Sequence, residues 1–329
     1  MRETQVLIVG GGPAGSACAW ALRRAGVETI VVDKQSFPRL KLCAGWITPR
    51  VLRQLRINPQ HYPHSLTRFK TLHFYIRGRP LTIPTRQYAI RRVEFDAWLL
   101  KRAHVPVVQH RVSSIVKKGD TFVVDDQYRS RYLVGAGGTA CPVYRTVFRE
   151  HMPRVPQTQL TTLELEVPYD FRDPRCFLWF FDKNLPGYSW YVPKQGGTLN
   201  LGIGAKAAVL QKRGETIQHH WLLFLDKLRQ LGLIGEEDWH PKGYTYFLRS
   251  PVAKNPQAGP AFVIGDAAGL ATLDMGEGIG PAVESGLCVA NAILHQKPVS
   301  FKRVNRYSAL PILFPELLSV FELKNKEFV

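Results

Sequence analysis

The N-terminal part of the chain alternates short apolar runs with a segment of helical periodicity. Residues 5–9 form an apolar run that ends in glycines, residues 14–25 repeat apolar side chains at helical spacing up to Gly26, and residues 29–33 form a β-branched run. This order predicts a strand, helix, strand unit of about 30 residues with a tight first turn.

The next segment continues this mixed pattern. Residues 93–103 place Phe95, Trp98 and Leu99 at helical spacing, which predicts a helix. Short apolar runs follow and predict strands over residues 105–109, 112–116, 121–125 and 132–134.

Between residues 160 and 204 the pattern changes to strands without helices between them, over residues 160–167, 176–181, 188–192 and 199–203. Such a run predicts an antiparallel sheet inserted into an α/β frame. A helix over residues 216–231 and a buried strand over residues 261–264 come next, and residues 301–329 are expected to be helical in pieces. The predicted fold class is therefore α/β, a Rossmann-like domain with an inserted antiparallel β-sheet substrate domain and C-terminal helices.

A glycine-rich loop joins the first predicted strand to its helix. Gly10, Gly12 and Gly15 have the spacing G-x-G-x-x-G, in which the first glycine permits the turn, the second admits a pyrophosphate and the third lets the helix pack on the strand. Asp33 ends the second strand, where a carboxylate can accept hydrogen bonds from an adenosine ribose. The loop predicts a dinucleotide site but does not distinguish NAD from FAD.

A second glycine-rich segment lies near the end of the chain, at residues 265–286. Asp266 follows the strand over residues 261–264, and residues 276–280 open a helix. The aspartate can accept from a ribityl hydroxyl, and the positive end of the helix can face the flavin edge where negative charge develops on reduction. NAD has neither group, so the two segments together predict FAD.

These motifs divide the chain into predicted domains. The FAD-binding domain is discontinuous and takes residues 1–65, 90–150 and 255–295. The substrate-binding domain takes residues 66–89 and 151–254, and residues 296–329 form a C-terminal helical segment.

Composition and charge narrow the function classes. Hydrophobic residues make up 45% and charged residues 21%, as in ordinary globular proteins. The net charge of +18 attracts anions, but no nucleic-acid-binding motif accompanies it, so dinucleotide phosphates or an anionic membrane surface are the expected partners rather than nucleic acid. The adjacent His219 and His220 cannot form a metal site on one helix face, and no metal is expected.

The five cysteines are odd in number and widely spaced, which predicts reduced thiols in a cytoplasmic protein. No signal-peptide pattern precedes the first strand, and no stretch approaches the ~20 apolar residues that span a bilayer. Any membrane contact is therefore expected to be peripheral, at the inner face. The oligomeric state stays open.

Several motifs together resemble the geranylgeranyl reductase family of FAD-dependent oxidoreductases, relatives of the aromatic hydroxylases. The resemblance spans residues 5 to 295. Its motifs are GGGPAG, Arg39-x-Lys41-x-Cys43-Ala44-Gly45, Arg92-x-x-Phe95-Asp96-x-x-Leu99, Gly135-Ala136-Gly137-Gly138, Tyr188-x-Trp190-x-Val192-Pro193-Lys194 and GDAAG with GEGI.

The resemblance implies a set of site residues. Those lining FAD would be Ala14, Asp33, Cys43, Ala44, Arg92, Val112, Asp266, Gly278 and Ile279, and those beside the isoalloxazine would be Tyr188, Trp190 and Val192. Cys43, Tyr188 and Trp190 are the catalytic candidates. Cys43 lies in a basic loop that can lower the pKa of a thiol, although a buried structural cysteine is the competing interpretation.

Three positions depart from the family pattern. Val192 replaces the usual Phe, Ala44-Gly45 replaces paired glycines, and Gly137 stands where relatives have an aspartate. The aromatic residues of the strands, among them Trp179, Trp190 and Tyr191, either line a substrate cavity or belong to the core.

The predicted function is reduction of a carbon–carbon double bond in an isoprenoid or other hydrophobic substrate by hydride transfer from reduced flavin. NAD(P)H or a reduced redox protein would donate electrons transiently, because no second G-x-G-x-x-G marks a nicotinamide domain. Two alternatives remain: a flavin-dependent monooxygenase or halogenase of the same fold, and a non-catalytic flavin-binding protein.

Overall fold

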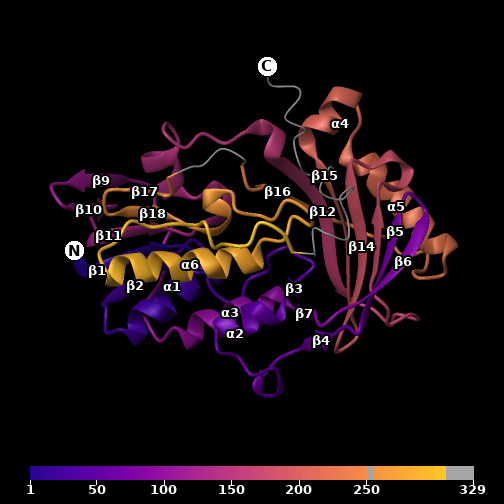
Figure 1. Cartoon of the computed structure of the whole chain (residues 1–329), viewed down its shortest axis with the longest axis horizontal. Coiled ribbons are helices and arrows are strands. Elements are labelled where there is room, and N and C mark those ends of the chain that lie inside the picture. Colours follow the sequence, from indigo (N-terminus) through magenta and orange to yellow (C-terminus); the bar gives the residue numbers. More distant parts are fainter. Residues whose placement is uncertain (251–254, 309–329) are drawn as a thin grey trace.

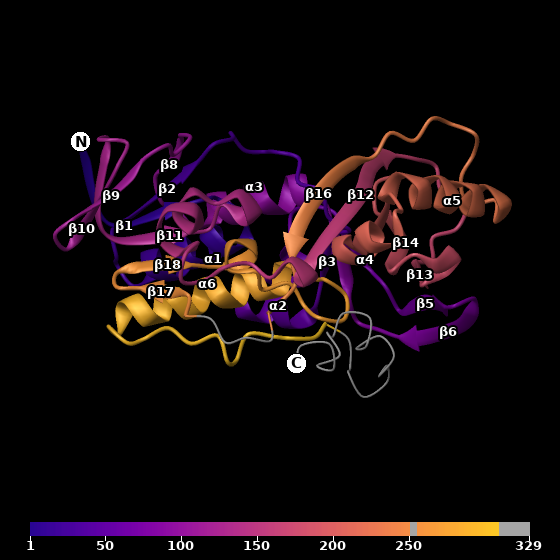
Figure 2. The same cartoon turned by 90° about the horizontal axis from the view of Figure 1, so that it is seen from above.

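A computed structural model describes residues 1–250 and 255–308 of the chain (Figure 1). Within these residues the strands form an eight-stranded, a seven-stranded and a three-stranded sheet. Figure 2 shows the two large sheets following one another along the long axis of the molecule. The predicted α/β fold class is confirmed.

The eight-stranded sheet is the Rossmann-like part. Strand β1 pairs in parallel with both β2 and β11, and β11 pairs in parallel with β18. Because β1 is covered on both faces, its residues 6–9 are continuously apolar and buried. The strands are β1 (Arg2–Val9), β2 (Thr29–Asp33), β8 (Val107–Gln109), β9 (Ile115–Lys118), β10 (Thr121–Val124), β11 (Tyr128–Gly135), β17 (Gln257–Ala258) and β18 (Ala261–Val263).

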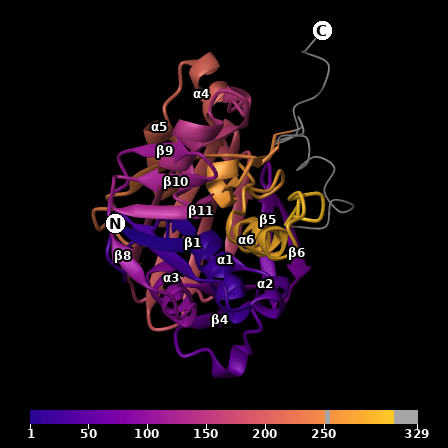
Figure 3. The same ribbon diagram turned by 90° about the vertical axis from the view of Figure 1, so that its left-hand side faces the viewer.

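Three helices accompany this sheet: α1 (Pro13–Arg24), α3 (Arg92–Arg102) and α6 (Ile279–Leu294). Figure 3 shows α1 between the other two. Gly286 lets α6 pack tightly on α1, because a Cβ at this position would lie 2.3 Å from the carbonyl oxygen of Ala14. This packing brings the two glycine-rich segments, which lie far apart in the sequence, side by side.

The seven-stranded sheet stands between α5 and the Rossmann-like sheet (Figure 1). Its strand order is β16, β12, β15, β14, β13, β5, β6. The strands are β5 (Thr71–Ile76), β6 (Arg79–Pro84), β12 (Gln159–Pro168), β13 (Phe177–Phe180), β14 (Gly187–Lys194), β15 (Thr198–Lys206) and β16 (Lys242–Phe247), and helices α4 (Ala207–Arg213) and α5 (Ile217–Gln230) follow β15.

Shorter elements join the two large sheets. The three-stranded sheet consists of β3 (Trp46–Ile47), β4 (Leu66–Arg68) and β7 (Tyr88–Ile90), next to helix α2 (Pro49–Gln54). Single helical turns occur at Pro59–His61, Gly138–Ala140, Tyr144–Phe148, Pro156–Thr158, Asp182–Asn184 and Gly265–Ala268. No helix of the described residues has both the length and the apolar character needed to cross a bilayer.

One secondary-structure prediction was wrong, and a second is tested only over the described part of its range. The strand expected over residues 112–116 begins only at Ile115, because the Asp125 carboxylate accepts hydrogen bonds from the backbone N–H groups of Ser113 and Ser114 and holds a loop there. Residues 296–308 contain no helix, and the rest of the expected C-terminal helical segment lies outside the described residues. The Arg249 guanidinium binds the carbonyls of Phe301 and Val304, which a helix would have used.

Candidate active site

Both glycine-rich segments open onto one cavity of about 610 Å³. Gly12 of the first segment and Gly278 of the second both line it, although 266 positions separate them in the chain. Gly265 allows this approach, since its φ is +59° and a Cβ there would lie 3.1 Å from the Cβ of Ala14. The two segments therefore form one site.

The first glycine loop is closed by backbone contacts. Gly10 has a φ of +116°, and an added Cβ would lie 2.4 Å from the carbonyl of Ala136, so only glycine fits this turn. Gly15 does not line the cavity; its missing Cβ makes room for the carbonyl oxygen of Gly10, as expected for helix packing. The Asp33 carboxylate lines the cavity and accepts a hydrogen bond from the Gly11 N–H at 2.8 Å.

Helix α1 begins at the cavity without an acidic residue in its first turn and without a side-chain cap. Its N-terminal N–H groups and its dipole are therefore available to an anion such as a pyrophosphate. Arg39 adds positive charge, and a Cβ at Gly12 would approach its Nη2 to 3.3 Å. Gly12 thus leaves room for an anion between the start of helix α1 and Arg39.

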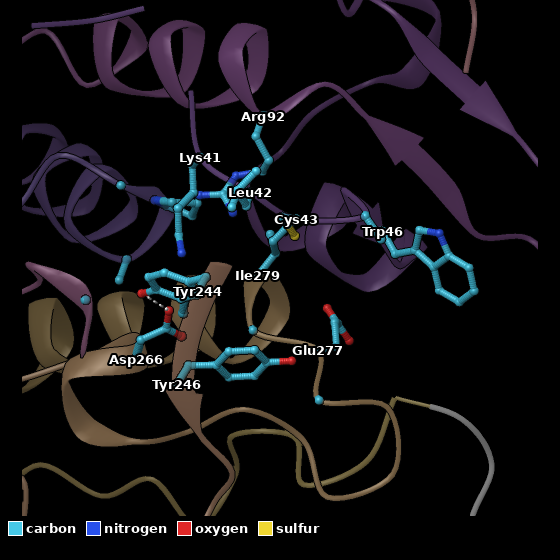
Figure 4. Close-up of a pocket in the computed structure, with 18 of the residues that line it drawn as sticks. Lys41, Leu42, Cys43, Trp46, Arg92, Tyr244, Tyr246, Asp266, Glu277 and Ile279 are labelled. Atoms are coloured by element: carbon cyan, nitrogen blue, oxygen red, sulfur yellow. Dashed lines mark hydrogen bonds between the residues drawn. The ribbon is translucent and has the colours of Figure 1, made fainter. Parts of the chain in front are cut away.

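Asp266 and the start of helix α6 bring the second glycine-rich segment to the cavity. The part of the cavity that the two glycine-rich segments line is called the cofactor half below. The Tyr244 hydroxyl donates to Asp266 Oδ2 at 3.4 Å, as Figure 4 shows. Glu277 precedes the N-cap Gly278 of α6 and accepts a hydrogen bond from the Gly280 N–H at 2.9 Å. Burial raises the pKa of Glu277 to about 7.

Lys41 is a half-buried cation that lines the cavity. Its Nζ lies 2.8 Å from the centre of the Tyr244 ring. Burial lowers the pKa of Lys41 to about 8, while the nearby Asp266 raises it. Lys41 is therefore still mostly protonated at neutral pH, although its pKa lies below that of an exposed lysine.

Cys43 lies in the loop that faces Arg92 (Figure 4). Arg92 opens helix α3 and forms two 2.7 Å hydrogen bonds to Asp96, which hold it at the cavity. Burial raises the pKa of the Cys43 thiol, although Arg92 opposes this shift. The direction is opposite to the lowering that the basic loop predicted, because removal from water outweighs the neighbouring charge.

The seven-stranded sheet supplies the apolar half of the cavity. Tyr188 and Trp190 of β14 line it, and the Tyr188 hydroxyl donates to the carbonyl of Met275 at 2.6 Å. Trp179 and Tyr191 instead belong to the core beneath α5, because alternate residues of a strand face opposite sides of the sheet. The aromatic set therefore divides between cavity and core. Val192 does not line the cavity.

One carboxyl in the apolar half was not found from the sequence. Glu164 on β12 is 3% exposed and lines the cavity. The side-chain amide of Asn200 donates to Glu164 Oε1 at 2.9 Å, and Asn200 Oδ1 accepts from the indole N–H of Trp190 at 2.8 Å. Burial raises the pKa of Glu164 to about 7. A lone glutamate in an alternating strand carries no motif that would have revealed it.

Tyr246 was also missed, together with its neighbour Tyr244. Both project from the same face of β16 into the cavity, and their rings stack with centroids 6.1 Å apart. The alternating sequence GYTYF carries a weak signal for this, since residues two apart share a face.

The structure brings nearly all predicted site residues together. Those lining the cavity are Gly10, Gly12, Ala14, Asp33, Cys43, Ala44, Arg92, Val112, Tyr188, Trp190, Asp266, Gly278 and Ile279. The site combines a glycine cradle, an open helix N-terminus and an apolar extension, which is a set of features that fits a flavin dinucleotide and a hydrophobic second ligand.

The fold and site define a flavoprotein oxidoreductase. An FAD binding domain family model matches residues 3–68. Menaquinone reductase of Mycolicibacterium smegmatis is 30% identical over 325 residues, covering 88% of this chain and 76% of that protein. The chain belongs to the geranylgeranyl reductase-like family of FAD-dependent oxidoreductases.

Two further comparisons agree with this assignment. Digeranylgeranylglycerophospholipid reductase 1 of Methanopyrus kandleri is 28% identical over 225 residues, covering 63% of this chain and 59% of that protein. The crystal structure of a geranylgeranyl bacteriochlorophyll reductase-like protein from Thermoplasma acidophilum superimposes with a TM-score of 0.75 at 20% identity, covering 91% of this chain and 81% of that one. This last likeness concerns the fold.

Proposed function

We propose that this oxidoreductase reduces a carbon–carbon double bond in the isoprenoid chain of a hydrophobic substrate. The observation that carries the proposal is the apolar extension of the cavity, lined by Trp46, Phe74, Tyr188 and Trp190, directly beside the residues suited to the flavin end. Aromatic and aliphatic walls favour a long apolar ligand. The reductases named above act, by their names, on menaquinone and on digeranylgeranylglycerophospholipid, which supports a prenylated lipid substrate.

The chain's own residues would hold FAD by its two ends. Gly10, Gly12 and the α1 N-terminus suit the pyrophosphate, Asp33 suits the adenosine ribose, and Asp266 with Gly278 suits the flavin end. When bound, FAD accepts two electrons from a donor and supplies the hydride for one carbon of the double bond.

Glu164 is proposed as the acid that protonates the other carbon. It is a carboxyl in the apolar half, it is oriented by Asn200, and its pKa of about 7 keeps a proton available in neutral solution. The adjacent Trp190 shares the same Asn200 side chain, which couples the orientation of the acid to the cavity wall.

The test is anaerobic turnover. Purified protein with bound FAD is mixed with a reductant and with menaquinone, geranylgeranyl diphosphate or a digeranylgeranyl lipid, and the product is analysed by mass spectrometry. A gain of two hydrogen atoms per reduced bond, without oxygen, is expected. Turnover that requires oxygen and adds oxygen or halogen to the substrate would instead identify the monooxygenase or halogenase alternative.

The electron donor is tested in the same preparation. Bleaching of the flavin absorbance by NADH, NADPH or a reduced ferredoxin under argon identifies the donor class. A flavin that none of these donors reduces would favour the non-catalytic alternative.

Replacement of Cys43 by serine is expected to leave FAD bound and to slow double-bond reduction about tenfold. Serine preserves the size of the side chain, but it removes the polarisable thiol from a half-buried position beside Arg92. Flavin absorbance and single-turnover rate measure the two effects. Cys141→Ser, a buried cysteine that does not line the cavity, is the matched control, and an unchanged rate in the Cys43 variant would remove this residue from the catalytic candidates.

A further inference from the structure

One long segment of the chain contains no acidic residue. Residues 34–93 hold 13 lysines and arginines but neither aspartate nor glutamate, where the average of the whole chain would give about five acidic residues. This segment crosses from the cofactor half of the cavity, through α2, to the β5–β6 hairpin at the edge of the seven-stranded sheet (Figures 1 and 2).

The arginines of this segment divide by whether they form an ion pair. Arg92 is buried and pairs with Asp96, whereas Arg50 is exposed and pairs with Glu284. Six further arginines are exposed, and within residues 1–250 and 255–308 none of them forms an ion pair; they are Arg53, Arg56, Arg68, Arg77, Arg79 and Arg86. These six cations are therefore available to an external anion.

Among the residues that the structure describes, the acidic side chains near the hairpin are paired elsewhere. Asp173 is paired with Arg175, and Asp182 is paired with Lys227. Within the described part of the chain, Asp173 and Asp182 therefore do not compensate the positive charge of the hairpin.

The same hairpin carries an apolar track from the cavity to the surface. Residues directly opposite each other in an antiparallel pair share one face of the sheet. Leu72 pairs with Ile83, and both line the cavity; Phe74, which also lines it, pairs with Leu81. Leu81 is 40% exposed, so this face continues from the cavity wall to solvent.

At the outer end of this face Arg79 pairs with Ile76, and Arg77 lies in the turn between the strands. Strand β6 is the edge of its sheet, with no further strand beyond it among the described residues. The order along the face is therefore cations, then an exposed leucine, then the apolar cavity.

We infer that the β5–β6 hairpin, residues 71–86, docks on the surface of an anionic lipid bilayer and that the hydrophobic substrate reaches the cavity along this face. This inference rests on the proposed hydrophobic substrate and names the partner that supplies it. Exposed cations attract anionic headgroups, and an exposed leucine between two prolines enters the headgroup region. Binding of an acidic protein would account for the exposed cations, but it would not account for an apolar track that leads into the cavity.

The experiment is co-sedimentation of the full-length protein, with FAD bound, with vesicles of phosphatidylglycerol and phosphatidylcholine or of phosphatidylcholine alone. We expect binding to the anionic vesicles and release by high salt. Since each cation near an anionic surface contributes roughly fivefold to the partition coefficient, R77Q/R79Q/R86Q should lower it about 100-fold. Leu81→Ser should lower it about fivefold, because less apolar surface is buried.

The matched control removes three exposed positive charges elsewhere, in K117Q/K118Q/R149Q, and is expected to change the partition coefficient by less than about fivefold. An equal loss in both triple variants would assign binding to the general charge of the chain and overturn the inference. So would absence of vesicle binding, or binding only to a small acidic redox protein through Arg77, Arg79 and Arg86.

The vesicle measurement needs no turnover, so it is independent of the proposed reaction. Arg77, Arg79 and Arg86 do not line the cavity, so the triple variant is expected to keep its flavin. Unchanged flavin absorbance and an unchanged thermal midpoint would show that this variant is folded. Vesicle binding without reduction of any prenyl lipid would retain the docking surface and reject the reductase function.

Discussion

Replacement of Gly10 by alanine is expected to produce a protein that no longer retains FAD. A Cβ at this position would lie 2.4 Å from the Ala136 carbonyl, so the turn between β1 and α1 must open by displacing backbone. Such overpacking, with the cost of a positive φ, amounts to about 3 kcal/mol. If binding must restore the turn, FAD affinity falls roughly 100-fold.

The ratio of flavin to protein absorbance after purification and a titration with FAD measure this loss. Gly26→Ala is the control, because Gly26 also has a positive φ, of +78°, but nothing lies within 4 Å of its Cβ position. The Gly26→Ala variant should have an unfolding free energy about 1 kcal/mol lower than that of the unmodified protein, and it should keep its flavin. Equal flavin content in both variants would show that the turn does not shape the dinucleotide site.

Replacement of Glu164 by glutamine is expected to slow double-bond reduction by roughly 100-fold or more, the usual contribution of a general acid. The raised pKa, about 7, fixes the sign of the pH dependence. The protonated carboxyl is the active form, so the rate is level below pH 7 and falls about tenfold per pH unit above it. The glutamine variant should lose this dependence, since its amide does not titrate.

Anaerobic single-turnover rates across pH test this prediction, and an infrared titration of the protonated carboxyl band gives a readout that needs no substrate. The control is Glu277→Gln, because Glu277 lines the same cavity and its pKa is also raised to about 7. If the Glu277 variant loses activity and its pH dependence while Glu164→Gln retains both, the proton comes from the flavin end of the cavity instead.

The two titratable carboxyls also predict how stability depends on pH. Folding raises the pKa of Glu164 and of Glu277 above the value of 4.5 that the unfolded chain has. Their protonated forms thus favour the folded state fully below about pH 4.5, and this contribution is lost as the pH rises toward 7. The acid proposed for catalysis therefore lowers stability at neutral pH.

How far the sequence predicts the structure differs between the two sheets. The apolar runs of β1 and β2, the spacing of Gly10, Gly12 and Gly15, and Asp33 predict the nucleotide site, because each of these signals is local in the chain. Strands β5 and β6 were not found, since β5 pairs in parallel with β13, about a hundred residues away, and β6 contains arginine, threonine and two prolines. Their strand character depends on that partner.

The alternation of β14 shows the same limit within one strand. It separates Tyr188 and Trp190 from Tyr191, but the period of two does not say which face meets a cavity. Helix α5 covers the Tyr191 face, and the Rossmann-like part leaves the Trp190 face open. Glu164 acquires its raised pKa only through this enclosure, since burial is a property of the assembled sheet.

The sequence by itself determined the α/β fold class, the dinucleotide turn and the presence of a second, flavin-end segment, because short-range backbone geometry and residue type govern each of them. Only the tertiary structure decided that these segments share one cavity, that Glu164 is the buried acid in its apolar half, and that unpaired arginines lie beside the track leading into it. These features arise from residues far apart in the chain, whose proximity, burial and loss of solvent come into being only when the two sheets pack together.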